Sequence, residues 1–444
     1  MENNKLQRRK FLKTTALSLG ATAFSPIATA SNKSKKKPVW KKCALHSHTH
    51  WSDGQSMPEV AITEFRNRGF DMLVMTEHNV FPEDKEAWIR VFDKSFEWPP
   101  SLTFQEYNRT KKQHKYIEKN YACKKFLKLK TFDQLKKEFE IPNKFLLAGG
   151  EEITTGATYP DGTRRECHLN LFNIDKTVMV WGKDIQSIIK SSLDTFKNLK
   201  AKSKRPMFMM LNHPFWCAWD VLPEDMLKFP ELTHFEICNG GASYDVSEFS
   251  PDKFWDVVLA NRLERKQGVI YATASDDTHY YDPPRVDKKS GGINNGWVMA
   301  RVDGDFTVDN TMKAIIAGDF YPTSGVLLKD IIYDKSSKTL SVEVDAVAGV
   351  EYKIEFITTK RGFDHSVKGK DFSPKNKRFK RTLPIYSDDI GKVVKTVKGT
   401  KASYKLKYND LYVRAKITSN VPTKITVPCY PKLQCAWTQP LANS

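Results

Sequence analysis

Residues 43–54 read Cys-Ala-Leu-His-Ser-His-Thr-His-Trp-Ser-Asp-Gly. A short apolar strand therefore ends in His46 and His48, and Asp53 follows in a Ser-Asp-Gly turn. Successive side chains of a strand point to opposite faces, so these two histidines, two residues apart, point to the same face. Imidazole and carboxylate together suit Zn²⁺, Mn²⁺ or Fe²⁺. The stretch predicts a strand that delivers metal ligands at its carboxyl end.

From this first strand up to Ala274, short apolar runs alternate with helical patterns. Helical periods cover residues 58–68, 185–200 and 251–266. Alternation of strand and helix is typical of a parallel sheet or barrel, and about seven such units favour a barrel. The predicted strands are Cys43–His48, Met72–Glu77, Phe145–Ile153, Cys167–Ile174, Met207–Asn212, His234–Cys238 and Val269–Ala274.

Histidines and acidic residues lie on these strands or directly after them. They are His78, the pair Glu151 and Glu152, His168, His213, Asp277 and His279. In a parallel barrel the carboxyl ends of the strands converge on one rim, where active sites lie. Several ligands from separate strands imply more than one ion, and a shared carboxylate can bridge two cations that share a hydroxide nucleophile.

This ordered set resembles the PHP (polymerase and histidinol phosphatase) family of metal-dependent phosphoesterases. The resemblance covers roughly residues 41–326. It is carried by His46-Ser47-His48-Thr49, Ser52-Asp53-Gly54, Thr76-Glu77-His78-Asn79, Gly150-Glu151-Glu152-Ile153, His168, Asn212-His213-Pro214 and Asp277-Thr278-His279. The resemblance implies a distorted seven-stranded β/α barrel that holds two or three divalent transition metal ions, zinc, manganese or iron.

The resemblance also implies a ligand set. One ion would be held by His46, His48, Glu152 and Asp277, a second by Asp53, His78 and His279, and a third by His168 and His213 with Glu152 as the bridge. Asp277 and His279 are the expected catalytic residues, because an acid or an imidazole can move a proton to the leaving group. Glu152 is preferred to Glu151 as the bridge because it directly precedes Ile153, as in the family pattern.

Two further expectations concern residues around the ligands. Glu77 stands where the family usually has Asp, and we expect it to lie behind the ligands rather than among them. Arg164, Arg165 and Arg285, on loops near the expected rim, are candidates for binding substrate, because a guanidinium forks onto phosphate. Arg285 is preferred because it follows the last ligand motif most closely.

Two other regions accompany the barrel of residues 41–326. Residues 83–144 interrupt the strand–helix rhythm with a helical, aromatic and basic insertion, either a lid or a surface decoration. From residue 327 to 444 the pattern is β-like, which predicts a small antiparallel β-sandwich as an accessory domain. The expected fold class is therefore α/β, a distorted (β/α)7 barrel of PHP type followed by this sandwich.

The N-terminus has the features of an export signal. Residues 8–13 read Arg-Arg-Lys-Phe-Leu-Lys, a twin-arginine pattern, and a weakly apolar stretch too short to span a bilayer follows. Residues 28–30 form a small-residue cleavage site before Ser31. The pattern predicts a signal peptide over 1–30, a linker over 31–40, and a bacterial protein exported by the twin-arginine (Tat) machinery to the periplasm or medium. We expect no transmembrane segment in the mature chain.

Composition narrows the class of substrate. The 444 residues carry a formal charge of +19, and residues 1–30 hold five Lys and Arg against one Glu, so the rest carries +15. This balance favours anionic partners, although the lysines could equally form a solvated surface. The hydrophobic share of 40% is too high for a disordered chain, and the mean hydropathy of −0.52 excludes a polytopic membrane protein. Nucleic acid is not expected as a partner, because no recognised binding motif is present.

The leading hypothesis is hydrolysis of a phosphate monoester or diester, on a small molecule or a glycan, by a metal-bridged hydroxide. A hydrolase that cleaves an amide or lactone at the same metals is one alternative. A non-catalytic exported protein that binds glycans is the other.

Overall fold

The computed structural model describes residues 39–94, 96, 101–241, 250–283, 291–373, 376–424 and 431–443. The predicted signal peptide, most of the predicted linker and Arg285 lie outside the described residues. Among the described helices, none combines the length and the apolar character needed to cross a bilayer.

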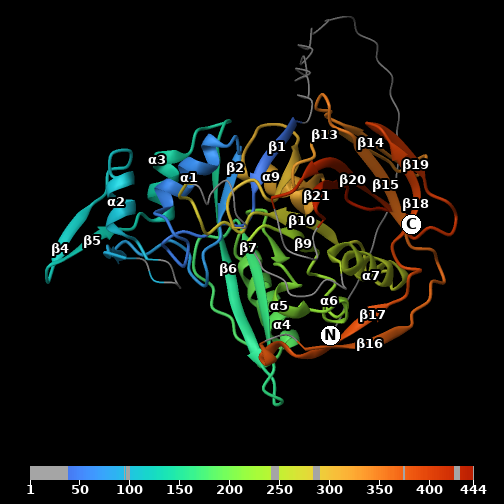
Figure 1. Cartoon of the computed structure of the whole chain (residues 1–444), viewed down its shortest axis with the longest axis horizontal. Helices are drawn as coiled ribbons and strands as arrows, with labels where there is room; N and C mark the ends of the chain where they lie inside the picture. Colours follow the sequence, from blue (N-terminus) through green and yellow to red (C-terminus); the bar gives the residue numbers. More distant parts are fainter. Residues whose placement is uncertain are drawn as a thin grey trace, which may run out of the picture. The chain divides into compact units, whose positions relative to one another are not determined.

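Seven strands form the barrel. They are β1 (Val39–Ala44), β2 (Met72–Met75), β6 (Leu146–Thr158), β7 (Arg164–Phe172), β8 (Phe208–Leu211), β9 (His234–Asn239) and β10 (Tyr271–Ser275). They pair in the order β10-β9-β8-β7-β6-β2-β1, and a parallel bridge between Ser47 and Thr278 joins the chain beyond β1 to the chain beyond β10. The predicted fold class is confirmed, and each predicted strand overlaps one of these seven (Figure 1).

One barrel strand runs against the others. β7 is antiparallel to both neighbours, β6 and β8, whereas the other neighbouring pairs of the barrel are parallel. Residues 159–163, Tyr-Pro-Asp-Gly-Thr, join β6 to β7, and Gly162 has φ 78°. Five residues make a tight turn but are too few for a parallel crossover. The first residues of β7 therefore lie at the rim where the parallel strands end.

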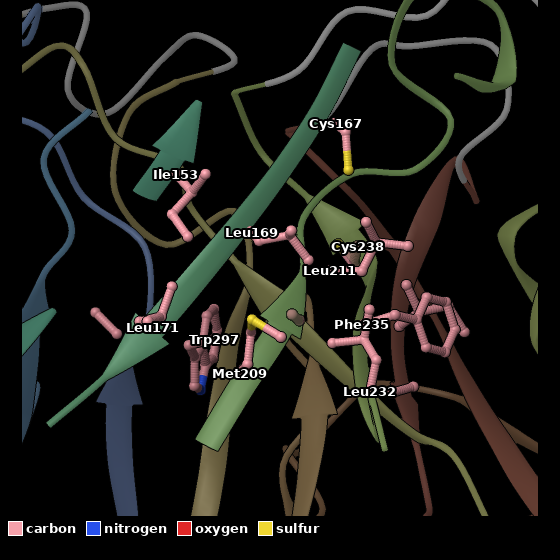
Figure 2. Close-up of a cluster of buried hydrophobic side chains, with 14 of the residues drawn as sticks. Ile153, Cys167, Leu169, Leu171, Met209, Leu211, Leu232, Phe235, Cys238 and Trp297 are labelled. Atoms are coloured by element: carbon pink, nitrogen blue, oxygen red, sulfur yellow. The ribbon is translucent and has the colours of Figure 1, made fainter. Parts of the chain in front are cut away.

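The alternation of side chains along the strands separates two layers. Leu146, Ala148, Phe172, Phe208 and Met210 belong to one buried cluster, to which β1 and β2 also contribute. The residues between them, such as those of β7 and β8 labelled in Figure 2, pack outward with the helices in a second cluster. The positions that continue the inward row toward the rim are Glu152, His168 and Asn212. The ligands predicted on β6 and β7 therefore lie on the inward face of their strands.

The covering helices begin at residues that stop the preceding chain. α1 (Pro58–Asn67) and α7 (Pro251–Glu264) start with proline, and α4 (Ile185–Ala201) is capped by Asp184, whose side chain accepts from the Ser187 amide at 2.7 Å. α7 is buried on several sides, with Trp255, Asp256 and Arg262 all inaccessible. A helix without an exposed polar face must be covered by a second element.

The insertion is not mainly helical, contrary to the prediction. It contains α2 (Phe104–Thr110) and α3 (Phe132–Phe139), but also a sheet of β3 (Trp88–Arg90), β5 (Lys124–Lys128) and β4 (Glu118–Tyr121). Ala122 and Cys123, with φ 47° and 59°, form the two-residue turn between β4 and β5. Positive φ at both turn positions matches the twist of a hairpin. The many lysines around this turn obscured the hairpin in the sequence.

The predicted antiparallel β-structure follows the barrel. β11 (Trp297–Val302) pairs with β1, and β12 (Phe320–Thr323) carries the sheet into β21 (Leu433–Trp437), β20 (Tyr412–Pro422), β15 (Tyr352–Thr358) and β18 (Lys392–Lys398). A second sheet consists of β13 (Leu328–Asp334), β14 (Thr339–Val344) and β19 (Lys401–Lys405), and both sheets contribute to one buried cluster. The described chain beyond residue 38 forms a single compact unit, so the domain boundary at residue 326 stays a prediction.

Buried charges join this β-structure to α7. Asp256 accepts from Arg414 at 2.8 and 2.6 Å and from the Tyr412 hydroxyl at 2.6 Å. Asp252 accepts from Lys416 at 2.6 Å and from the Trp437 indole at 3.1 Å. Burial alone would lower the pKa of Arg414, but Asp256 and Asp252 raise it. The second face of α7 is therefore covered by β20 and β21.

A hairpin arm leaves the β-structure and reaches the barrel. It consists of β16 (Val367–Phe372), a short turn of 3-10 helix and β17 (Arg381–Tyr386), and it lies beside α6 (Pro223–Leu227) (Figure 1). The Tyr386 hydroxyl donates to Glu224 of α6 at 2.7 Å, and Lys253 of α7 donates to the carbonyls of Ser387 and Ile390 at 2.6 and 2.8 Å.

Candidate metal centre

The structure brings the predicted ligands together at the rim of the barrel. They fall into three groups, and within each group the ligand atoms lie within 4.8 Å of one another. The groups are His46, His48 and Glu152; His48, Asp53, His78 and His279; and Glu152, His168 and His213. Asp277 lies beside the first group, and Arg285 is outside the described residues. These buried groups are consistent with a centre for several metal ions.

Four ligand atoms converge here, three from the first group and one from Asp277 beside it. Nε2 of His46 lies 3.2 Å from Oε2 of Glu152 and 3.4 Å from Oδ1 of Asp277. Nε2 of His48 lies 3.3 and 3.1 Å from the same two oxygens. All four atoms are buried and make no hydrogen bond of good geometry within the described chain, and Oε2 of Glu152 also lies 2.8 Å from Nδ1 of His78. Buried polar atoms are normally paired, so this convergence is the geometry expected around a cation.

The carboxylate of Glu152 faces two groups at once. Its Oε2 points to the first group, while its Oε1 lies 3.1 Å from Nδ1 of His168 and 3.5 Å from Nε2 of His213. Burial would raise the pKa of Glu152, but His46, His78 and His168 lower it well below the usual range. One carboxylate shared in this way can bridge two cations.

Glu151 points away from the cluster. Its Oε2 accepts from the backbone amide of Val178 at 2.8 Å, on the outward face of β6. Burial raises the pKa of Glu151 to about 8. Of the acidic pair, Glu152 is therefore the residue that the structure places among the ligands.

The second group surrounds Asp53. Oδ1 of Asp53 lies 3.3 Å from Nε2 of His78, 3.3 Å from Nε2 of His279 and 3.9 Å from Nδ1 of His48. Burial would raise the pKa of Asp53, but hydrogen bonds from His279 and His78 lower it. His48 thus faces the first group through one ring nitrogen and the second group through the other.

Hydrogen bonds orient two imidazoles of the cluster. Nδ1 of His46 lies 2.8 Å from Oε1 of Glu236, and Nδ1 of His279 lies 2.9 Å from the carbonyl oxygen of Asp277. A proton held on Nδ1 by these acceptors leaves Nε2 as the coordinating atom of each ring. Although burial lowers the pKa of His46, Asp277, Glu152 and Glu236 outweigh it and raise this pKa well above the usual value. The donor set of imidazole and carboxylate fits zinc, manganese or iron.

Sequence reasoning missed Glu236 and Asn212. Glu236 is buried on β9, where it also accepts from the backbone amide of His213 at 2.8 Å. Asn212 donates to Oε1 of Glu152 at 2.8 Å and to Asn170 at 2.9 Å. The isolated acid in the apolar run His-Phe-Glu-Ile-Cys could have been noticed, because a fully buried Glu needs a partner.

Glu77 fastens the loop that carries the first ligands. It accepts from the Thr49 amide at 2.9 Å, from the Thr49 hydroxyl at 2.6 Å and from the Ser52 hydroxyl at 2.6 Å. In the same loop, a Cβ at Gly54 would lie 2.3 Å from the carbonyl oxygen of His48, so only glycine fits. Glu77 therefore lies behind the ligands, as expected.

Backbone strain marks the last ligand strand. Asp277 has φ 48°, the left-handed region that non-glycine residues rarely adopt. Gly241 packs against it, since a Cβ there would lie 2.4 Å from the carbonyl oxygen of Asp277. Asn239 donates to Oδ2 of Asp277 at 3.1 Å, which leaves Oδ1 turned to the cluster. Strained residues of this kind concentrate at functional sites.

The ligands open into a pocket of about 720 Å³. Asp53, His78, His168, His213, Asp277 and His279 line it together with Ser52, Thr154, Glu166, Trp216, Gly241, Tyr280 and Gly291. The ring centroid of Trp216 lies 5.0 Å from that of His168 and 5.3 Å from that of His213. Glu166 is paired with Arg164, 2.9 Å from Nη2 to Oε2. His50 and His234, which were not predicted as ligands, do not line this pocket.

No family model matches this chain, and no curated protein matches it. The chain is similar to the solved structure of a two-domain protein containing a predicted PHP-like metal-dependent phosphoesterase from Bacteroides vulgatus. The sequence identity is 14%, the match covers 92% of this chain and 96% of that chain, and the TM-score is 0.39. It is also similar to a provisionally assigned metal-dependent phosphoesterase from Bifidobacterium adolescentis, with 12% identity, 63% of this chain and 97% of that chain covered, and a TM-score of 0.29. A third similar structure is an amidohydrolase from Chromobacterium violaceum with bound sulfate and no metal. The identity is 12%, the match covers 53% of this chain and 87% of that chain, and the TM-score is 0.27.

Proposed function

We propose that this protein is an exported metal-dependent phosphoesterase that hydrolyses a phosphate monoester or diester on a small molecule or a glycan. The observation that carries the proposal is the convergence of Nε2 of His46, Nε2 of His48, Oε2 of Glu152 and Oδ1 of Asp277 without a hydrogen bond of good geometry in the described chain. Two or three divalent ions bound there would supply a hydroxide nucleophile at neutral pH and neutralise the charge of the phosphoryl oxygens.

The described lining of the pocket leaves the binding of an anionic group to the metal ions. Among the described lining residues there is no Lys or Arg. The acidic side chain of Glu166 is already neutralised by Arg164. A phosphoryl group in this pocket would therefore depend on the ions for its charge balance, and the charge of +15 outside residues 1–30 would favour its approach.

Asp277 and His279 are placed to handle the proton of the reaction. Burial would raise the pKa of Asp277, but His46, His48 and His279 lower it well below the usual range, so the carboxylate stays ionised at neutral pH. Both side chains line the pocket, with Nε2 of His279 3.3 Å from Asp53. We assign to Asp277 and His279 the transfer of a proton from the attacking water to the leaving oxygen, through an atom of the side chain that does not hold an ion.

Trp216 gives the pocket one aromatic wall beside the third group. A half-exposed indole can pack against the apolar face of a sugar or aryl ring. The alcohol released from the substrate would then leave along this wall.

The test begins with the metal content of the purified protein by elemental analysis, followed by hydrolysis of bis(p-nitrophenyl) phosphate and p-nitrophenyl phosphate. A lactone and an amide are assayed in parallel, with an Asp53→Asn variant as the inactive control. We expect two to three ions per chain and cleavage of a phosphate ester. Cleavage of the lactone or amide alone would replace the proposal with the first alternative, and glycan binding without hydrolysis would replace it with the second.

A further inference from the structure

The arm of the β-structured part makes a buried polar contact with barrel segments that lead to the metal centre. The side chain of Arg381, at the start of β17, is 5% exposed and lies within the barrel surface. It belongs to the sequence region that the resemblance to PHP enzymes does not cover. Its position therefore suggests a link between that region and the site.

The guanidinium of Arg381 joins two separate segments of the barrel. Nη1 donates to Oδ1 of Asp220 at 2.8 Å and to the carbonyl oxygen of Trp219 at 3.2 Å. Nη2 donates to the carbonyl oxygen of Arg164 at 2.8 Å. A planar guanidinium presents donors in several fixed directions, whereas an ammonium is a single point charge.

Each of the two segments carries one ligand of the third group. Arg164 opens β7, and His168 lies four residues further along the same strand. Trp219 and Asp220 end the turn that begins at His213, where the Trp216 amide donates to the His213 carbonyl at 2.9 Å. His168 and His213 face the same oxygen of Glu152. Arg381 therefore contacts both chains that carry the ligands of the third group.

The turn after His213 contains a strained residue and a buried carboxylate, and both accept hydrogen bonds from Arg381. Trp219 has φ 61°, a left-handed conformation that is costly for a bulky residue. Its carbonyl is one of the acceptors of Arg381. Asp220 is a buried carboxylate with a side-chain exposure of 3%, and such a charge requires a partner.

We propose that Arg381 is a positioning residue for the third metal group, holding the strand of His168 and the turn of His213 at the distance that Glu152 requires. The three hydrogen bonds of Arg381 described above all end on the two segments that carry His168 and His213. Loss of Arg381 should therefore loosen the third group and leave the other two in place. The metal readout of this inference rests on the proposed function, whereas the exchange readout below does not.

The experiment compares Arg381→Ala and Arg381→Lys with Tyr386→Phe in the full-length mature protein. Tyr386 lies on the same arm but donates to Glu224 of α6, which is outside both segments. Hydrogen exchange followed by mass spectrometry should show at least about tenfold faster exchange of residues 164–168 and 213–221 in Arg381→Ala, because a surrounding hydrogen-bond network limits local opening. Residues 46–53 and 277–279 should exchange as in the parent, and Tyr386→Phe should leave all four segments unchanged.

Metal retention gives the second readout. After dialysis against a chelator at a concentration that leaves the parent fully loaded, Arg381→Ala should hold about one ion fewer per chain, and Arg381→Lys should lose less. Unchanged exchange in both segments, or equal acceleration across the whole barrel, would overturn the proposal. If Arg381→Ala does not fold, Asp220→Asn is measured instead, since it keeps the shape of the contact and removes its charge. A parent protein without metal would refute the proposed function, while the exchange data would still decide the role of Arg381.

Discussion

Oε2 of Glu152 lies 3.2 Å from Nε2 of His46, and neither atom makes a hydrogen bond of good geometry in the described chain. Glu152 comes from β6 and His46 from the loop after β1, and β2 lies between these strands. Two ionisable side chains from separate strands approach this closely in a buried place when charge holds them together, either as an imidazolium–carboxylate pair or around a shared cation. The other oxygen of Glu152, Oε1, lies 3.1 Å from Nδ1 of His168, so one carboxylate faces imidazoles of two groups.

Replacing Glu152 with Gln should remove more than one ion per chain, because the amide cannot act as a charged bridge between two groups. Glu151→Gln is the matched control, since it changes the neighbouring residue on the opposite face of the strand. Elemental analysis of both purified variants checks the prediction. A Glu152→Gln variant with full metal content would remove this residue from the centre.

Replacing Glu236 with Gln should weaken metal binding about 10–100-fold, the usual cost of losing a carboxylate that orients a ligating histidine. Gln keeps an acceptor for the His213 amide, so the effect should come through His46. Titration of the metal-loaded protein with a chelator gives the affinity. An affinity equal to that of the parent would mean that Glu236 does not orient the imidazole.

The pH dependence of stability should report on Glu151. Its pKa is about 8 in the fold against an ordinary value of 4.5. Because the fold favours the protonated form, its stabilisation is fully present below pH 4.5 and is lost as the pH rises toward 8. Glu151→Gln has no charge to bury, so its melting temperature relative to the parent should rise between pH 6 and pH 8. A difference that stays constant over this interval would contradict the burial of an ionisable Glu151.

Much of the site could be predicted from local sequence, because strand period fixes which residues face inward. The period of two placed His46 and His48 on one face, whereas the choice of Glu152 over Glu151 came from the resemblance to the PHP family. The direction of β7 does not follow, since alternation looks the same in either direction, and only the short Tyr-Pro-Asp-Gly-Thr turn distinguishes a hairpin from a crossover. The contact of Arg381 with Arg164 joins residues 217 positions apart, and no local pattern encodes it.

Export should depend on the arginine pair of the signal. Changing Arg8 and Arg9 to Lys should leave the protein in the cytoplasm with residues 1–30 uncleaved, because the pair is the feature that the twin-arginine pathway recognises. Cell fractionation with detection of the chain length measures both effects. Normal secretion of the double variant would indicate another route.

Arg414→Ala should cost about 3–5 kcal/mol of unfolding free energy, because removing one partner leaves buried charge uncompensated. The side chain of Arg414 is fully buried and neutralises Asp256 and Asp252 on the inner helix α7. Lys329→Ala is the control, since Lys329 pairs with Glu343 at 2.7 Å but is 67% exposed, and such pairs contribute about 0–1 kcal/mol. Urea denaturation of the metal-loaded variants gives both values. The barrel covers one side of α7 and β20 covers the other. A chain ending at Gly325 should therefore lose solubility, because the charged and apolar side chains of α7 would be exposed. Equally small losses of unfolding free energy in Arg414→Ala and Lys329→Ala would show that the β-structure is not a structural cover for the barrel.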